Sequence, residues 1–246
     1  MCGRYAYTLP HETTRQLFNA ASVALSPPRY NIAPTQPIIA VWQDESGRHG
    51  KLARWGLVPH WVKDPRDFPL IVNARSETLS QKPAFRDAVK HSRCVIPASG
   101  YYEWHRAGSV KQPYYINYKS GEPLAMAGLY TTWIGPEGEE VDTAAVVTVG
   151  ANADLSGIHD RMPALLDADG IEDWLNVRSV RADAALARLA PAPEGVMQAR
   201  MVSSRVNSAA NDGPDMIEPA PESPDRPEKG KSMSNQAKKA DQLDLF

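Results

Sequence analysis

Short stretches of apolar and aromatic residues, separated by turns that contain glycine or proline, recur along the chain as far as about residue 211. Each stretch is only a few residues long and contains β-branched or aromatic residues, which is typical of β-strands. We therefore predict strands at Ile38–Gln43, Lys51–Gly56, Leu70–Asn73, Arg93–Ile96, Gly100–Arg106, Tyr114–Tyr118, Leu124–Trp133, Ala144–Gly150 and Met197–Val202.

Apolar residues at helical spacing interrupt the strands at four places. They predict helices at His11–Ala21, Ala84–His91, Ile171–Asn176 and Arg181–Leu189. The central strands follow one another through short turns such as Gly135–Glu140, which favours antiparallel pairing over a parallel βαβ sheet. We expect an α+β fold in which residues 1–211 form a single domain, an antiparallel sheet or barrel flanked by helices.

Residues 212–246 differ sharply in composition from the rest of the chain. They contain five prolines, eight acidic residues, five basic residues and few apolar ones. Such a segment cannot bury enough apolar surface to offset the entropy lost when a chain becomes ordered. We predict that it is a disordered C-terminal tail.

Composition excludes several classes of protein. Apolar residues make up 42% of the chain and charged residues 23%, as in an ordinary globular protein. No apolar run approaches the roughly 18 residues that a membrane-spanning helix needs, and the N-terminus lacks the pattern of a secretion signal. The two cysteines, Cys2 and Cys94, form no CxxC pair and no disulfide framework. We therefore expect a cytoplasmic protein without a membrane partner.

The balance of charge limits where nucleic acid can bind. The net charge at pH 7 is −2, of which the tail contributes −3, so residues 1–211 carry +1. A protein with this balance has no global basic field that attracts nucleic acid. Any nucleic-acid site must therefore be local.

The start of the chain offers an unusual nucleophile. Met1 precedes Cys2, and initiator methionine is normally removed before a small residue such as cysteine. The exposed α-amine would titrate near ~7.7–8.0, against ~10.4 for a lysine, so it is the better amine for attacking an aldehyde. The thiol can then close onto the imine as a five-membered thiazolidine. The alternative is that Cys2 is an arbitrary small residue after the start.

Seven motifs, in order between residue 2 and about residue 205, provide independent information. They are MCGRY, YNIAPTQ (Tyr30–Gln36), RWGLVPHW (Arg54–Trp61), NARSET (Asn73–Thr78), RCVIPASGYYEW (Arg93–Trp104), LAMAGLY (Leu124–Tyr130) and IHDRMP (Ile158–Pro163). Together they resemble the SOS response-associated peptidase (SRAP) family, the abasic-site processing proteins. The resemblance implies a single domain with an antiparallel, barrel-like β core and peripheral helices, and a groove for single-stranded DNA. It also implies covalent capture of the aldehyde at an abasic site, and a proteolytic activity that includes removal of Met1.

The resemblance assigns the chemistry to Cys2, Asn73, Glu103 and His159, with no metal and no organic cofactor. The aromatic neighbours of Glu103 can raise the pKa of its carboxyl group, so that it delivers a proton. His159 can move protons near neutral pH, and the amide of Asn73 can orient the α-amine or the sugar hydroxyl. The alternatives are an outward-facing charge, a structural histidine and a turn-forming asparagine.

Five residues are candidates for DNA contact. Arg4, Asn31, Arg75 and Ser76 match family positions that lie near DNA, and a planar guanidinium suits a phosphate. Trp61 follows Pro59 and His60 in a predicted loop, where its ring could stack on a base. The family often has a second aromatic residue next to it, where this chain has Val62. A surface salt bridge for Arg4 and an Asx-turn for Asn31 are the alternatives.

The last five residues read QLDLF. This pentapeptide is similar to those by which bacterial proteins bind the DNA polymerase sliding clamp. Gln242 offers an amide, and Leu243, Leu245 and Phe246 offer apolar side chains that a disordered tail otherwise has no reason to expose. We predict that the tail binds a sliding clamp, with a segment folding back onto the domain as the alternative.

The sequence therefore predicts a monomeric DNA-repair protein that shields abasic sites in single-stranded DNA near replication forks. Two other hypotheses remain open. Class II glutamine amidotransferases also begin with Met-Cys-Gly, so the chain could be an N-terminal-nucleophile amidotransferase. Alternatively, it could be a single-stranded DNA binder or clamp adaptor that never reacts.

Overall fold

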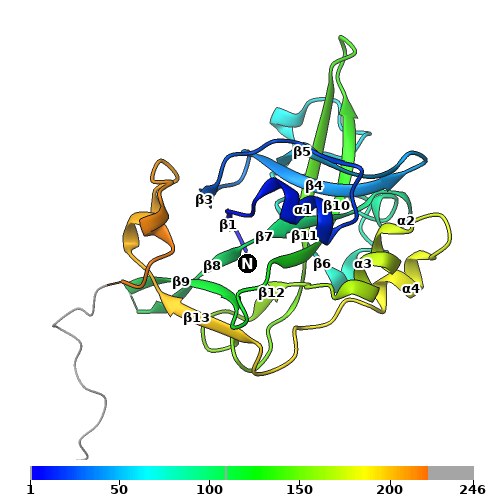
Figure 1. Cartoon of the computed structure of the whole chain (residues 1–246). Helices are drawn as coiled ribbons and strands as arrows, with labels where there is room; N and C mark the ends of the chain where they lie inside the picture. Colours follow the sequence, from blue (N-terminus) through cyan, green and yellow to red (C-terminus); the bar gives the residue numbers. More distant parts are fainter. Residues whose placement is uncertain (1, 109, 221–246) are drawn as a thin grey trace, which may run out of the picture.

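Two β-sheets contain the strands of the structure, a computed structural model that describes residues 2–108 and 110–220 (Figure 1). The first sheet is antiparallel throughout. In spatial order it consists of β13 (Met197–Met201), β9 (Val110–Tyr118), β8 (Gly100–Ala107), β1 (Tyr5–Tyr7) and β3 (Arg29–Ile32). The first strand of the chain therefore lies inside this sheet, which fixes the position of the residues just before it.

The second sheet closes into a barrel. Its closed ring consists of β4 (Pro37–Asp44), β5 (Gly47–Trp55), β11 (Glu140–Gly150), β10 (Leu124–Ile134) and β7 (Arg93–Ala98). Parallel pairing of β5 with β11 completes the ring, and closure removes the unpaired edges that an open sheet would expose. The predicted α+β domain with a barrel-like core is confirmed.

Three short strands extend the barrel, and they depart from purely antiparallel pairing. β2 (Ser22–Val23) is parallel to β5, and β6 (Asn73–Arg75) is parallel to β11, whereas β12 (Arg161–Pro163) is antiparallel to β11. Strands of two to four residues are too short to show alternation, so the sequence did not predict β1, β2, β3 or β12. The strand predicted from Leu70 forms only a bridge at Ile71 before β6 begins.

Four short α-helices accompany the strands in the described residues. They are α1 (His11–Leu17), α2 (Ala88–His91), α3 (Ala168–Leu175) and α4 (Ala182–Leu186). α1 ends before the predicted Ala21, and Asn19 has a φ of 46°, which lies outside the helical region. α3 starts earlier than predicted, because the side chain of Asp167 accepts a hydrogen bond from the Gly170 backbone N–H and caps the helix. Helix positions were therefore predicted better than helix ends.

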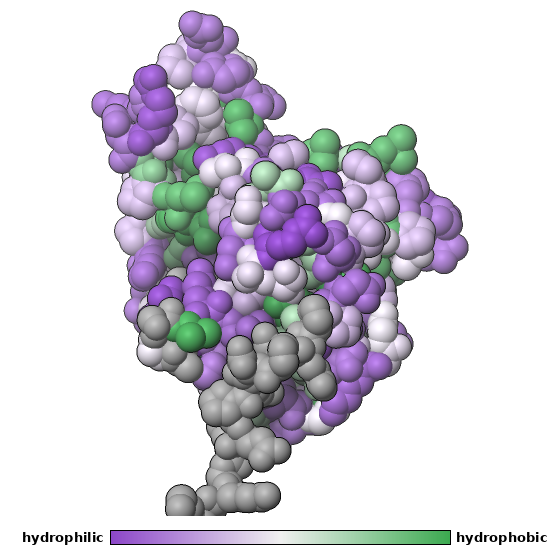
Figure 2. Space-filling view, turned by 90° about the vertical axis from the view of Figure 1, so that its left-hand side faces the viewer, coloured by the Kyte–Doolittle hydropathy of each residue, from purple (hydrophilic) through white to green (hydrophobic). Residues whose placement is uncertain are grey.

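The folded region continues past residue 211. The Asp212 carboxylate accepts hydrogen bonds from the Arg29 side chain and from the backbone N–H groups of Tyr30 and Asn31. Met216 is fully buried in a small apolar cluster with Val202 and Val206. The face of the molecule in Figure 2 is mainly hydrophilic, with a few separate apolar patches. The predicted boundary at residue 211 is therefore too early, because composition does not show how Asp212 pairs. The rest of the predicted tail, residues 221–246, lies outside the described residues.

A buried arginine joins two helices to the barrel. Arg93, at the start of β7, is 1% exposed. Its guanidinium donates hydrogen bonds to the backbone carbonyls of Val89, Trp174, Asn176 and Val180. Burial lowers its pKa to about 10, and the carbonyls at the C-terminal ends of α2 and α3 offset the cost of burying the charge.

We expect Arg93→Met to lower the free energy of unfolding by about 3 kcal/mol or more, since several buried carbonyls would lose their donors. Urea unfolding followed by tryptophan fluorescence would measure the loss. The control is Arg188→Met, whose ion pair with Asp173 is exposed and is expected to contribute less than about 1 kcal/mol. Equal free energies of unfolding for Arg93→Met and Arg188→Met would show that the hydrogen bonds from Arg93 to these carbonyls do not stabilise the fold.

Candidate active site at the chain start

Cys2 lies in the core although it is the second residue of the chain. Its side chain is fully buried, and it precedes β1 by three residues. The Asn73 side-chain amide donates a 2.7 Å hydrogen bond to the Cys2 carbonyl. Asn73 is the first residue of β6, which pairs with β11 of the barrel. The barrel therefore holds the start of the chain through Asn73, and the first sheet holds it through the pairing of β1 with β8.

The surroundings of the Cys2 thiol keep it protonated. Burial raises the pKa of the thiol, and the negative charge of Glu103 raises it further. The sulfur has a weak contact, at 3.9 Å, with the Arg4 carbonyl oxygen. A thiol in this state is not a resting thiolate nucleophile. A reaction at Cys2 must therefore supply a base, or begin at another atom of the residue.

Glu103 is a buried carboxyl group on β8. It is 3% exposed. Burial raises its pKa, and the nearby charge of His159 partly opposes this shift. The sequence alternative, an outward-facing charge, is therefore wrong. A carboxyl group with a raised pKa retains its proton to higher pH and can deliver it to a leaving hydroxyl.

His159 lies before β12, with its side chain 29% exposed. Its Nδ1 is 3.0 Å from the Arg161 backbone nitrogen and 2.7 Å from a carboxylate oxygen of Asp160. The two contacts suit different protonation states. A neutral ring accepts at Nδ1 from the Arg161 N–H, whereas a protonated ring donates from Nδ1 to Asp160. Nδ1 of His159 therefore has a hydrogen-bond partner whether the ring is neutral or protonated.

Glu103 leads to a prediction about stability and pH. Because burial raises its pKa above the ordinary 4.5, the fold favours the protonated form. The stability that this provides is complete below the unfolded pKa and is lost as pH rises through the raised pKa. Glu103→Gln cannot ionise, so we expect a higher Tm than the wild type at neutral pH and a smaller difference in acid.

Thermal unfolding between about pH 4 and pH 8 would measure this difference. Glu122→Gln, which changes an exposed carboxylate, is the matched control and should leave the Tm profile unchanged. A Glu103→Gln variant that is less stable than the wild type at neutral pH would show that the ionised carboxylate stabilises the fold.

The structure separates the two candidates Arg4 and Asn31. Arg4 is half-buried, and its Nη1 donates to the Asn31 side-chain oxygen at 2.8 Å and to the Val206 carbonyl at 2.7 Å. Asn31 is fully buried, and its amide donates to backbone carbonyls of Ser208 and Asn211. Asn31 therefore has no surface for DNA. The side-chain oxygen of Asn31 instead accepts the hydrogen bond that orients Arg4, and the C-terminal segment covers the Asn31 amide.

Trp61, Arg75 and Ser76 are accessible. Trp61 is 51% exposed, and its ring packs edge-on against Phe68 with centroids 5.6 Å apart. Arg75 is exposed and has no ion-pair partner in the described part of the chain, and Ser76 is half-buried beside it. Their exposure leaves the ring of Trp61 and the guanidinium of Arg75 accessible to solvent, and contact with DNA at these positions stays a prediction.

Several buried polar atoms of residues near Cys2 in the sequence or in the site have no hydrogen-bond partner among the described residues. In the part of the chain that the structure describes, they include the hydroxyls of Tyr5 and Tyr101, Oδ1 of Asn73 and Nε of Arg4. Buried polar groups are normally paired, so these atoms are candidates for contact with a bound group or with a reacting atom. The sequence analysis missed both tyrosines, although Tyr101 precedes Glu103 by two residues and so shares its face of the strand.

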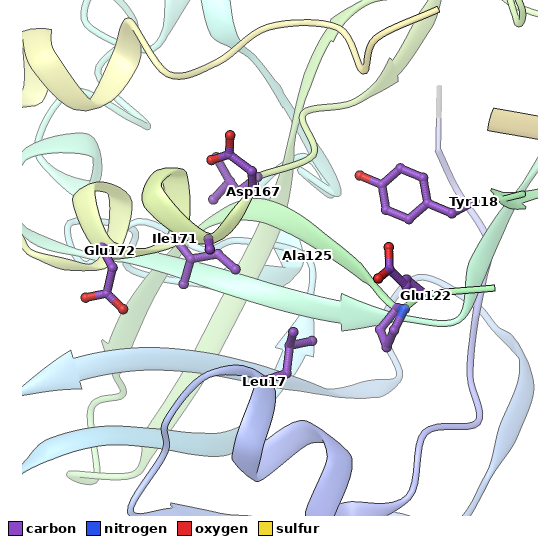
Figure 3. A pocket seen from close by; sticks show the side chains of 10 residues that line it. Leu17, Tyr118, Glu122, Ala125, Asp167, Ile171 and Glu172 are labelled. Atoms are coloured by element: carbon purple, nitrogen blue, oxygen red, sulfur yellow. The ribbon is translucent and has the colours of Figure 1, made fainter. Parts of the chain in front are cut away.

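Another concave surface among the described residues does not suit DNA. A groove of about 380 Å³ lies between α1, α3 and the turn after β9. Figure 3 shows the carboxylates of Glu122, Asp167 and Glu172 around it, and their charge disfavours DNA phosphates. None of the predicted site residues lines this groove. Among the described side chains, no cluster of three or more His, Cys, Asp or Glu could hold a metal ion, and no helix is long and apolar enough to cross a membrane.

Comparison with known proteins gives consistent results. A family model described as SOS response associated peptidase (SRAP) matches residues 1–209. The chain is 40% identical to the abasic site processing protein YoqW of Bacillus subtilis (strain 168), over 89% of this chain and 99% of YoqW. It is 29% identical to the abasic site processing protein YedK of Escherichia coli (strain K12), over 89% of this chain and all of YedK. A crystal structure of a protein from Bacteroides thetaiotaomicron has a TM-score of 0.80 at 26% identity and covers 89% of this chain.

Proposed function

Because this chain belongs to the SOS response associated peptidase (SRAP) family, we propose that it processes abasic sites in single-stranded DNA by forming a thiazolidine with Cys2. The names of relatives that match nearly the whole chain support abasic-site processing. The observation that carries the chemistry is the placement of Cys2: a buried chain start, held by Asn73 and facing the buried carboxyl group of Glu103.

The first step removes Met1. Hydrolysis of the Met1–Cys2 peptide bond adds one water and frees the α-amine of Cys2. The family name is consistent with a peptidase that does this to itself, and an aminopeptidase is the other source. Without this step the nitrogen of Cys2 is an amide, which is not a nucleophile.

The capture then proceeds in two parts. The α-amine adds to the aldehyde carbon of the opened sugar, and the resulting carbinolamine loses its hydroxyl as water with a proton from Glu103. The Cys2 sulfur next attacks the iminium carbon, the C=N electron pair returns to nitrogen, and the thiol proton passes to the Glu103 carboxylate. Asn73 orients the chain start, and His159 exchanges protons with the site. The balance is one water released and Glu103 restored.

DNA would reach this site along accessible cationic and aromatic side chains. Arg4 and Arg75 suit phosphates on either side of the lesion, with Asn31 holding Arg4 in place. Ser76 can donate a hydrogen bond to a neighbouring phosphate, and Trp61 can stack on a base. The contacts are local, which agrees with the absence of a basic net charge on the chain.

The direct test mixes the mature protein with single-stranded DNA that contains one abasic site, and with undamaged DNA of the same sequence. We expect a denaturant-resistant adduct with the abasic strand only, whose intact mass is the sum of protein and DNA minus one water. Equal binding of both strands without a covalent product would support a non-reacting DNA binder or clamp adaptor. Ammonia release from glutamine would support an amidotransferase.

The C-terminal motif is a separate part of the proposal. Gln242, Leu243, Leu245 and Phe246 lie outside the described residues, and we propose that they bind a bacterial sliding clamp. Binding there would hold a monomeric domain near replicating DNA in the nucleoid and raise its effective concentration at that DNA. Deletion of residues 242–246 should abolish clamp binding in pull-down experiments and leave adduct formation unchanged. Clamp binding that survives the deletion would contradict this role.

A further inference from the structure

Two buried phenols beside Cys2 have no part in the steps above. We infer that the hydroxyls of Tyr5 and Tyr101 donate hydrogen bonds to the Cys2 sulfur as it loses its proton, and thereby position the thiolate for ring closure. The inference rests on the proposed function, since ring closure is a step of that reaction.

The two tyrosines occupy facing positions on neighbouring strands. Tyr5 of β1 lies opposite Tyr101 of β8 in the antiparallel register, and both are fully buried. Side chains at such positions stand on the same face of a sheet, and Glu103, two residues after Tyr101, shares that face. Cys2 is only three residues before Tyr5 along the chain and is fully buried like both tyrosines. One face of the β1–β8 pair thus presents two phenols and a carboxyl group beside the start of the chain.

Neither phenol has a hydrogen-bond partner among the described residues. Other buried tyrosines of the same strands do: the Tyr7 hydroxyl is 2.8 Å from the Thr14 hydroxyl, and the Tyr102 hydroxyl donates to the Tyr30 carbonyl at 2.6 Å. A buried hydroxyl without a partner destabilises a fold, and phenylalanine would avoid that cost. The unpaired hydroxyls therefore point to a role that the resting state does not use.

Electrostatic coupling to Cys2 accompanies this arrangement. Burial raises the pKa of both phenols, and Cys2 is the next largest cause of the rise for each of them. Glu103 also raises the pKa of Tyr101, whereas Tyr7 raises the pKa of Tyr5 and Arg29 lowers it. Both phenols are thus protonated donors at neutral pH, and each is coupled to the charge that develops on the sulfur.

Ring closure creates a need for such donors. The Cys2 thiol is buried, which raises its pKa, so removal of its proton leaves a charge in apolar surroundings. In the proposed step the proton moves from sulfur to the Glu103 carboxylate, the S–C bond forms, and the C=N electron pair returns to nitrogen. The phenols keep their own protons and stabilise the thiolate by hydrogen bonding, as donors do for developing anions in other enzymes.

The test compares Tyr5→Phe, Tyr101→Phe and the double variant with Tyr7→Phe, whose hydroxyl is paired. In mature protein with Cys94→Ala and 13Cβ-labelled cysteine, the chemical shift of Cys2 reports thiol ionisation directly. We expect the thiol pKa to rise by about one unit for each phenol removed, with unchanged or higher Tm because no hydrogen bond is lost. Tyr7→Phe should instead lower the Tm and leave the titration unchanged.

Kinetics with abasic DNA provide the second measurement. Imine formation, trapped with borohydride, should proceed at the wild-type rate in the Phe variants, whereas conversion to the hydrolysis-resistant ring should slow about tenfold per phenol. Wild-type thiol titration in the double variant would overturn the inference, whatever its adduct rate. If the wild type forms no adduct at all, the proposed function fails, and the titration still tests the phenols independently.

Discussion

We expect Cys2→Ala to form no denaturant-resistant adduct with abasic single-stranded DNA, a loss of at least about 100-fold in yield. Alanine is also small, so Met1 should still be removed and an α-amine should still attack the aldehyde. The imine that results has no sulfur to close onto it, and it hydrolyses when the protein is denatured. Denaturing electrophoresis would show the loss, and borohydride should recover a covalent product by reducing the imine.

The second cysteine provides the matched control. Cys94 is fully buried in β7 and takes no part in the proposed chemistry, so Cys94→Ala should keep the wild-type adduct yield. Protein that retains Met1, separated from the mature form by mass, should not couple to the lesion. Wild-type yield from Cys2→Ala would remove Cys2 from the reaction.

We expect Glu103→Gln to slow adduct formation by about 10²–10⁴-fold, the usual contribution of a general acid or base. Glutamine has nearly the same shape, yet it can neither deliver the proton that releases water nor accept the thiol proton afterwards. The wild-type rate of water release should fall as pH rises through the raised pKa of Glu103, whereas the variant should show no such dependence. Single-turnover kinetics across pH would measure both effects.

The two effects of this substitution have opposite signs. Glu103→Gln should be more stable than the wild type at neutral pH and much slower, because a buried ionisable group weakens the fold while it serves the reaction. Glu122→Gln should change neither property. A Glu103→Gln variant that is both stable and fully active would show that another group moves the protons.

Local sequence patterns predicted most of the strands. The predicted strands around β4, β5, β7, β8, β9, β10, β11 and β13 all exist, because each is long enough for apolar and β-branched residues to show their period. The parallel closure of the barrel was not readable, since pairing of Arg54 with Thr143 joins segments that are distant along the chain. Nor did composition reveal that Asp212 fastens the residues after 211 to β3.

The candidate site shows the same division. Residue identity suggested the amine and thiol of Cys2 and the ring of Trp61, and the resemblance of the motifs to the family added the carboxyl group of Glu103. Identity did not show that Asn31 is enclosed, because the carbonyls that surround its amide come from residues more than 170 positions later. It also did not distinguish Tyr5 and Tyr101, which lack partners, from Tyr7 and Tyr102, which have them.

The sequence by itself determined which nucleophilic, acidic and cationic side chains this protein has and where along the chain they occur, and which short segments become strands. These properties belong to single residues or to their near neighbours. The tertiary structure alone decided that Asn73 holds the Cys2 carbonyl from 71 residues away, that burial raises the pKa of Glu103, and that the hydroxyls of Tyr5 and Tyr101 are buried without a hydrogen-bond partner among the described residues. Burial and pairing depend on which distant residues pack around a group, and local sequence patterns do not show which residues those are.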